Sequence, residues 1–245
     1  MGRPFLRYAD VTTAPFDGMP VGHFLSIEAS TAAGSVAIVA DGALLAQVNV
    51  PVGVSRDDGM FPALQRVLAD CALAPGDLAG VVCGAGPGSF TSLRIGAALA
   101  KGIAHGANVP LFAVPSLLLA AAHAADHVAP GEYLMHADAL RGERYAQPVR
   151  IDMRRRVRAA GLMVRVAMSD IATCAVNRLR LAVGSSPAPG DEHAIVVPHA
   201  SAVLRVCPWR EFGPVSLDAW EPLYGRLAEA QVVWEHTHGH ALPAR

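Results

Sequence analysis

The sequence predicts an α/β protein with two lobes, each built on a mixed β-sheet that is covered by helices. Three observations lead to this prediction. Short β-rich segments alternate with longer segments of helical period between residues 23 and 128. A Pro-Gly turn stands at residues 130–131. After that turn, the pattern starts again with two further strand-like segments.

The first lobe is expected over residues 23–128. The segments "HFLSIEAS" (23–30), "GSVAIVA" (34–40) and "ALLAQVNV" (43–50) are short, β-rich and separated by glycine-containing turns, which indicates three consecutive antiparallel strands. The following segments predict a helix over 57–73, a strand over 78–84, a helix over 89–106, a strand over 111–116 and a helix over 116–128. This order gives a mixed sheet covered by helices.

The second lobe is expected to be smaller and to cover residues 129–230. The segments "EYLMHADA" and "ERYAQPVRI" predict paired strands, and a further hairpin is expected beyond residue 150. Residues 1–22 lack the hydrophobic run of a signal peptide and are interpreted as a loose N-terminal extension. Residues 231–245 are interpreted as a flexible tail.

The composition excludes several classes of protein. Of the 245 residues, 52% are hydrophobic and 17% are charged, so disorder on a large scale is excluded. A formal net charge of −1 gives no global field that would attract nucleic acid or an anionic membrane. Four cysteines without a CxxC pair indicate reduced thiols and a cytoplasmic location. The longest apolar stretch, residues 109–122, contains two prolines and is too short to span a bilayer.

A glycine-rich loop, "CGAGPGSFTSLRIG" (83–96), follows a predicted buried strand and leads into a predicted helix. It matches neither the G-x-G-x-x-G dinucleotide fingerprint, nor a Walker A loop, nor a G-x-S-x-G nucleophile turn. Two interpretations remain. The loop is either a structural turn with a helix cap, which is the commoner case, or a site where free backbone amides meet an anion.

The segment "GAGPGSFTSLRIGAALAKGIAHGANVPLFAVPSL" resembles the signature of the TsaB (YeaZ) family, which usually reads GxGPGSFTGxRIG. Three further segments resemble the family in the same order: "LSIEASTAAGSVAIV", "HADALRGERY" and "EPLYGR". Together these matches extend over most of residues 24–226. The resemblance implies the actin-like, ribonuclease-H-like ATPase fold, which agrees with the predicted order of elements.

The resemblance also implies a function. Members of the family are non-catalytic subunits in the synthesis of tRNA threonylcarbamoyladenosine, where they bind and activate a TsaD-like transferase. A TsaE-like ATPase is the other implied partner, with tRNA met only through the complex and a homodimer as an alternative when the protein is alone. ATP and metal are expected on the partner proteins, no cofactor on this chain, and no membrane partner.

Four positions depart from the family pattern: Glu28 replaces an aspartate, Ser92 a glycine, Arg56 a histidine and Gly225 a leucine. These departures argue against a demanding catalytic site, so no catalytic residue is assigned. The glycine loop is interpreted as a vestigial phosphate site, made of Glu28, Ser30, Gly86, Pro87, Gly88, Ser89, Phe90 and Thr91.

No metal site is predicted. TsaD binds metal through an H-x-x-x-H pair, and on the same register this chain has Ser116 and Ala120. His123 and His127 stand at i, i+4 spacing and could share zinc with a third ligand, but two solvated histidines are the commoner case. Three histidines alternate in the tail, at positions 236, 238 and 240, and could bind metal nonspecifically.

Residues 141–165 contain eight arginines against two acidic residues. In particular, Arg154, Arg155, Arg156 and Arg158 form a cluster that could contact tRNA phosphates in an assembly. A solvated hairpin rim is the alternative, and the lack of interleaved aromatic residues favours it.

The helix over 89–106 is expected to dock against a partner. At 100° per residue, Leu99 and Ile103 are placed to face the sheet, while the small residues from Gly96 onwards form a second strip that is left free for another helix. The predicted interface consists of Phe61, Leu64, Leu68, Arg94, Ala97, Ala100, Lys101 and Ala104. Packing of both helices within their own lobe is the alternative.

A rival function comes from a different class. An ATP-dependent transferase or kinase of the same fold would use Glu28, Ser30 and the amides of residues 86–89 around a nucleotide phosphate. A stand-alone tRNA-binding protein is disfavoured by the net charge.

Overall fold

A computed structural model gives the fold, and it describes residues 19–50, 56–184 and 195–224. The predicted tail and most of the predicted N-terminal extension lie outside these residues, as do the three tail histidines and Gly225. Arg56 begins a helix, but its side chain is not described.

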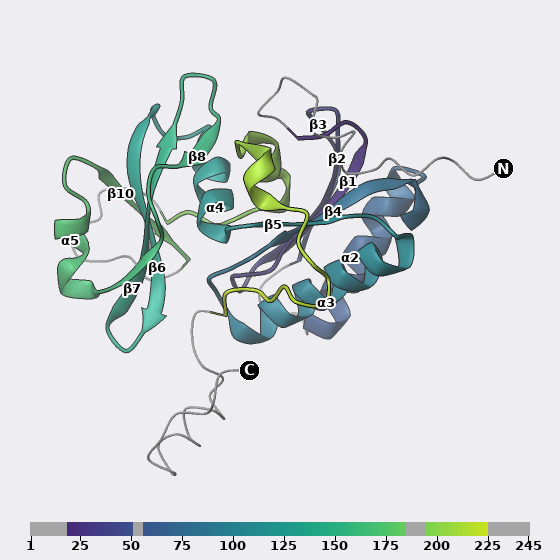
Figure 1. Ribbon diagram of the computed structural model, residues 1–245, viewed down its shortest axis with the longest axis horizontal. Helices are drawn as coiled ribbons and strands as arrows, with labels where there is room; N and C mark the ends of the chain where they lie inside the picture. Colours follow the sequence, from purple (N-terminus) through teal and green to yellow (C-terminus); the bar gives the residue numbers. More distant parts are fainter. Residues whose placement is uncertain (1–18, 51–55, 185–194, 225–245) are drawn as a thin grey trace, which may run out of the picture.

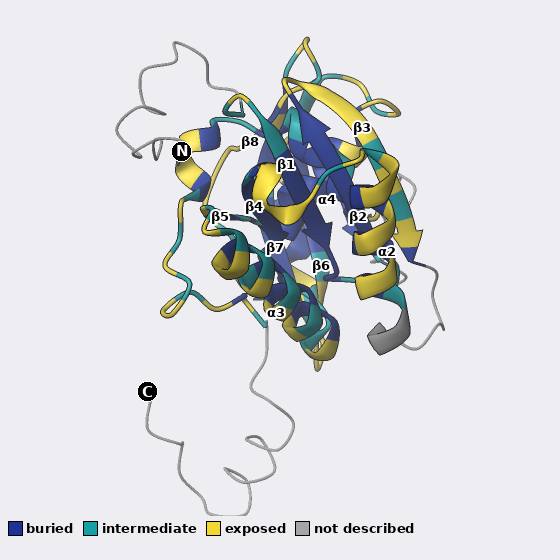
Figure 2. Cartoon of the chain, turned by 90° about the vertical axis from the view of Figure 1, so that its right-hand side faces the viewer, coloured by how far each residue is buried: buried dark blue, intermediate teal, exposed yellow. Residues whose placement is uncertain are grey.

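The first lobe contains a five-stranded mixed sheet in the order β3-β2-β1-β4-β5 (Figure 1). Its strands are β1 (His23–Glu28), β2 (Gly34–Ala40), β3 (Ala43–Val50), β4 (Leu78–Gly84) and β5 (Leu111–Val114). The first three run antiparallel to one another, while β4 and β5 run parallel to β1. The prediction of three consecutive antiparallel strands is therefore confirmed. Strands β1, β2 and β4 are buried, whereas the edge strand β3 is largely exposed (Figure 2).

Two helices, α2 (Arg56–Asp70) and α3 (Phe90–Ala107), cover one face of this sheet. The prediction for the orientation of α3 is wrong. Gly96, Ala97, Ala100 and Ala104 are buried, and Ala100 and Ala104 belong to the core, whereas Leu99 and Ile103 are only partly buried. The reason is close packing: a Cβ atom on Gly96 would stand 3.1 Å from the Cβ atom of Ala29, so only small residues fit here.

The second lobe contains a sheet in the order β10-β6-β7-β8, and β9 also pairs with β7. The strands are β6 (Gly131–Leu140), β7 (Glu143–Ile151), β8 (Val157–Ala159), β9 (Val164–Ala167) and β10 (Leu179–Val183). The short helix α5 (Ile171–Cys174) packs on one face of this sheet in a small apolar cluster. The predicted strand pair is confirmed. Beyond residue 150, β8 and β9 do not form a hairpin with each other, and each of them pairs with β7 instead.

Between the two sheets lie α4 (Ser116–Ala124) and the 3-10 turns η3 (Ala200–Arg205) and η4 (Trp209–Phe212) (Figure 1). The remaining 3-10 turns are η1 (Pro75–Asp77) and η2 (Met168–Asp170). A single apolar cluster joins Phe24 and Phe112 of the first sheet, Tyr133 of the second, and Trp209 of η4. The two lobes therefore share this cluster, while a second apolar cluster lies within the first lobe beneath α2 and α3.

The end of the second lobe differs from the prediction. The second sheet begins at Gly131, but the chain returns to the first lobe before residue 224. The N–H of Val215 donates to the carbonyl of Leu111 on edge strand β5 (2.9 Å), and the N–H of Leu223 donates to that of Ala85 (2.8 Å). We call residues 215–224 the C-terminal strap. Within the described ranges, no helix has both the length and the apolar character needed to cross a bilayer.

Candidate functional site

The glycine loop lies at the carboxyl ends of the parallel strands β1, β4 and β5, beside the buried side chain of Glu28. The carboxylate of Glu28 accepts two hydrogen bonds, one from the N–H of Ser30 (2.6 Å) and one from the hydroxyl of Ser116 (2.9 Å). Ser116 Oγ in turn accepts the N–H of Gly86 (3.1 Å), and the N–H of Ser116 donates to the Gly86 carbonyl (2.9 Å). One polar chain thus joins the ends of three strands.

Steric contacts explain the glycines of this loop. A Cβ atom on Gly84 would overlap the Glu28 carboxylate, and a Cβ atom on Gly88 would overlap the carbonyl of Ser30. That carbonyl already accepts the N–H of Ser89 at 2.8 Å. The amides of Gly86 and Ser89, which the phosphate interpretation needs, therefore donate to groups of the protein itself.

The electrostatics at the loop are governed by burial. Burial raises the pKa of Glu28, and hydrogen bonds from Ser30 and Ser116 oppose this effect only in part. Burial also raises the pKa of the neighbouring Cys83 thiol, and the Glu28 carboxylate adds to the rise. Cys83 is therefore a protonated core thiol without nucleophilic character.

A cavity of about 250 Å³ opens between the lobes next to the loop. Its polar lining comes from three parts of the chain: Ser30, Thr31 and Ser89 of the first lobe, Asp138 and Tyr145 of the second, and Tyr224 of the strap. Apolar residues such as Ala137, Leu140 and Val183 form the rest of the wall, so the cavity has a mixed polar and apolar lining.

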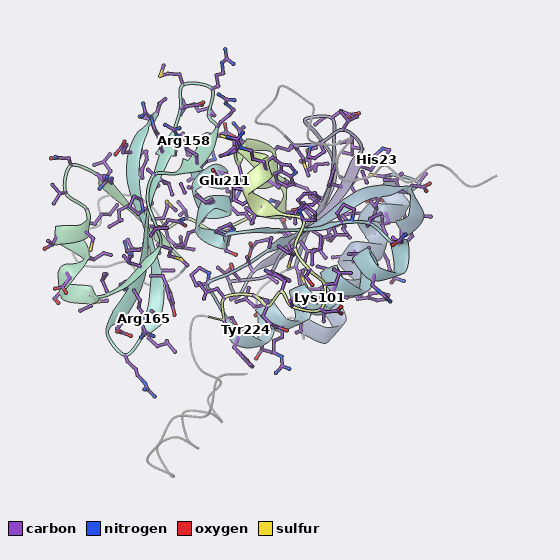
Figure 3. The ribbon with its side chains drawn as sticks, viewed as in Figure 1. His23, Lys101, Arg158, Arg165, Glu211 and Tyr224 are labelled. Atoms are coloured by element: carbon purple, nitrogen blue, oxygen red, sulfur yellow. The ribbon has the colours of Figure 1, made fainter. Side chains whose placement is uncertain are left out.

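The strap covers one flank of α3. Lys101 Nζ lies 3.5 Å from a carboxylate oxygen of Glu221 and 5.7 Å from the ring centroid of Trp220. The hydroxyl of Tyr224 donates to Glu221 (2.6 Å), and its ring lies 4.8 Å from that of Phe90. Lys101 and Tyr224 lie on the same side of the molecule (Figure 3).

These contacts change the predicted partner interface. Leu64, Leu68, Ala97, Ala100 and Ala104 are buried inside the first lobe and are not available to a partner, because they pack against the sheet. Lys101 faces the strap.

Other residues remain accessible on the two helices. Phe61 is 48% exposed, and Arg94 is exposed with its guanidinium 5.2 Å from the Phe90 ring centroid. Thr91, Ala98 and Gly102 form the outward side of α3, which the prediction did not include.

The histidines considered for a metal have other contacts. His123 Nδ1 donates to the carbonyl of Val197 (2.9 Å), and its ring stacks on that of His199 with centroids 5.0 Å apart. His127 lies with His123 at a separate cavity of about 330 Å³. Across residues 19–50, 56–184 and 195–224, no three His, Cys, Asp or Glu side chains gather where they could hold a metal ion.

Sequence reasoning missed several residues of this region. Ser116 was considered only as the counterpart of a metal ligand, yet it links Glu28 to the glycine loop. Its position directly after a strand parallel to β4 was the signal that could have identified it. Asp138, Tyr145 and Tyr224 come from distant parts of the chain, and no local pattern indicated that they would meet.

The sequence and the fold are both similar to those of known proteins. The sequence model of TsaD, the tRNA N6-adenosine threonylcarbamoyltransferase, matches residues 56–168. The tRNA threonylcarbamoyladenosine biosynthesis protein TsaB of Bacillus subtilis (strain 168) is 34% identical over 99 residues, which cover 40% of this chain and 43% of that protein. TsaB of Escherichia coli (strain K12) is 33% identical over 121 residues, covering 49% and 52%.

A crystal structure of a Pseudomonas aeruginosa protein described as similar to peptidase YEAZ superposes with a TM-score of 0.72 at 22% identity, covering 84% of this chain and 100% of that chain. These matches support the TsaB (YeaZ) family as the group of proteins that this chain is clearly similar to. The chain shares its two-sheet α/β fold with that Pseudomonas aeruginosa protein. The aligned regions span about half the length of the curated TsaB proteins.

Proposed function

We propose that this chain is a non-catalytic subunit in the synthesis of N6-threonylcarbamoyladenosine in bacterial tRNA, and that it binds and activates a TsaD-like transferase in the cytoplasm. Its similarity to TsaB proteins supports this role, because the curated relatives are named for that pathway. In this proposal a TsaE-like ATPase is the second protein partner, and ATP and metal bind to the partner proteins.

The accessible surface of α2 and α3 carries the proposal (Figure 2). Phe61 of α2 presents a large, half-exposed apolar side chain, and α3 presents Thr91, Ala98 and Gly102 to the outside together with the exposed Arg94 and His105. A Cβ atom on Gly102 would meet no atom within 4 Å. Small side chains on an exposed helix allow a second helix to approach closely, because side-chain size sets the distance between packed helices.

The family comparison supports a matching surface on the partner. The TsaD model matches the chain from residue 56 onwards, a range that contains both α2 and α3. A TsaD-like transferase would therefore carry an equivalent helix pair. Two such pairs facing each other would form a four-helix seam.

An arginine placed on the outer side of α3 tests this seam. Ala98→Arg is expected to weaken binding of the TsaD-like transferase by at least tenfold, because a charge would be buried in a close helix contact. The measurement is isothermal titration calorimetry with the transferase of the same organism. Ala172→Arg, at an exposed alanine of α5 in the other lobe, is the matched control and should bind normally.

An unchanged affinity of the Ala98→Arg variant would mean that the seam lies elsewhere. Substitutions at Ala97 or Ala100 would not test the seam, because both side chains are buried in the lobe and a charge there would unfold it.

The competing function is an ATP-dependent transferase or kinase, and the cavity between the lobes is the observation in its favour. The hydrogen bonds donated by Gly86 and Ser89 within the protein argue against it, since these amides would have to hold the phosphates. Titration of the isolated protein with Mg-ATP should therefore show no saturable heat at millimolar ligand. A micromolar Kd would support the enzyme instead.

A further inference from the structure

A row of charged side chains crosses the second sheet. Strand register places Arg150 of β7 directly opposite Glu132 of β6 on one side and opposite Arg158 of β8 on the other. Beyond β6, the guanidinium of Arg178 lies 3.3 Å from the Glu132 carboxylate. We call Arg178, Arg150 and Arg158 the outer basic row.

The row lies on the face of the sheet that points away from α4. Val149, Ile151 and Val157, the neighbours of these arginines along β7 and β8, are buried in the shared core. Because successive side chains alternate between faces, Arg150 and Arg158 point to the opposite face, where both are exposed. In Figure 3, Arg158 lies at the upper end of the second lobe, far from Arg165.

Charges within the row are not balanced. Glu132 lies between Arg178 and Arg150 and is already paired with Arg178. Arg150 and Arg158 face each other directly, and like charges in this position repel. Neither of them forms an ion pair with any residue in the described part of the chain.

The side chains of two other arginines of the cluster, Arg155 and Arg156, make contacts within the protein. The guanidinium of Arg155 donates hydrogen bonds to the carbonyls of Ala125 and Val128, which follow the C-terminal end of α4. Arg156 is paired with Asp152 at 3.0 Å. The same Asp152 side chain accepts the backbone N–H of Arg154, at the exposed turn between β7 and β8. Within the described residues, the side chains of Arg155 and Arg156 are therefore held by the protein itself, whereas those of Arg150 and Arg158 are not.

We propose that the outer basic row binds the phosphate backbone of a double-helical RNA stem. Guanidinium groups bind phosphate in a bidentate manner, and phosphate would relieve the repulsion between Arg150 and Arg158. Three strand spacings make the row from Arg178 to Arg158 about 14 Å long, enough to contact more than one phosphate. The row itself contains no aromatic side chain on which the bases of a single strand would stack. The choice of RNA rests on the proposed function, whereas the charge argument does not.

The test measures binding of a fluorescein-labelled, unmodified tRNA transcript to the full chain by fluorescence polarisation, at several salt concentrations. The double variant Arg150→Gln/Arg158→Gln is expected to bind at least tenfold more weakly. The slope of log affinity against log salt should become shallower by about two, because two phosphate contacts are lost. Arg66→Gln/Arg210→Gln removes two exposed arginines elsewhere and should keep the affinity and the slope.

The double variant should fold normally, with a melting temperature no lower than that of the original protein, because a repulsive pair is removed. An unchanged affinity and slope in this variant would overturn the proposal, as would the absence of tRNA binding by the original protein. Equal loss of binding to single-stranded RNA and to a duplex would overturn the assignment of a double helix.

Two outcomes separate this proposal from the docking proposal. Loss of transferase binding with unchanged tRNA binding in the double variant would assign the row to an acidic protein surface and overturn the RNA assignment. The Ala98→Arg variant, which is expected to lose the transferase, should keep its affinity for tRNA.

Discussion

The buried carboxyl group of Glu28 stands where the family usually has the shorter aspartate. Its extra methylene places the carboxylate within hydrogen-bonding distance of both the Ser30 N–H and the Ser116 hydroxyl. Gly84 leaves the space that this side chain needs. In this chain, Glu28 at the end of β1 is therefore linked to the glycine loop by hydrogen bonds through Ser116.

The pH dependence of stability should reveal this residue. Burial raises the pKa of Glu28, so between pH 4.5 and its folded pKa the native protein holds a proton that the unfolded chain releases. The group therefore lowers the free energy of unfolding as the pH rises through this range. Glu28→Gln does not titrate and should lose less stability between pH 5 and pH 8 in urea unfolding. Parallel pH curves for the two proteins would contradict this expectation.

For helix α3, the sequence predicts the position in the chain correctly but not the face that is buried. Its limits, the order of the elements around it and the neighbouring strands follow from apolar periodicity and glycine turns. The rotation of α3 about its own axis cannot be predicted in this way. Apolar and small residues surround most of the helix, so the periodicity allows more than one face to be buried. The packing of Gly96 against Ala29 selects the face, and this contact joins residues far apart in the sequence.

Two glycine-to-alanine substitutions distinguish the two effects that a new Cβ atom can have on stability, which are steric overlap and a gain in helix propensity. Gly88→Ala should lower the free energy of unfolding by about 2 kcal/mol, because the new Cβ atom overlaps the Ser30 carbonyl and opens the loop. Gly102→Ala, inside α3 with no atom nearby, should raise it by about 0.5–1 kcal/mol through helix propensity. Urea denaturation measures both changes. A stable Gly88→Ala protein would contradict the packing described for the loop.

Across the whole molecule, the segment that begins at His199 joins the lobes through a series of hydrogen bonds. Ala200 accepts from the Ser26 hydroxyl of β1 (2.8 Å), and its N–H donates to Ser35 of β2 (2.9 Å). His199 Nε2 lies 2.7 Å from Asn49 Oδ1 of β3. Sequence reasoning placed this segment in the second lobe because no local pattern records such long-range contacts.

Acid should weaken this junction. Burial and the nearby His123 lower the pKa of His199 to about 4, whereas the unfolded chain protonates at its ordinary value of 6.5. Between these values only the unfolded chain takes up the proton, so the protein loses stability as the pH falls from 6.5 towards 4. His199→Gln lacks this titration, and its melting temperature should fall less between pH 7 and pH 4.5. Equal decreases in the two proteins would contradict the assignment.

The return of the C-terminal strap to β5 has a consequence for how the protein is made. A ribosome releases residues 23–128 long before residues 199–224, yet Phe24 and Phe112 pack against Trp209, and β5 pairs with Val215. The nascent first lobe therefore emerges with an uncovered apolar face and an unpaired strand edge, both of which favour aggregation. Native packing becomes complete only after residue 224 has been synthesised, so a chain truncated before residue 199 loses the integrity of its first lobe as well as part of its second.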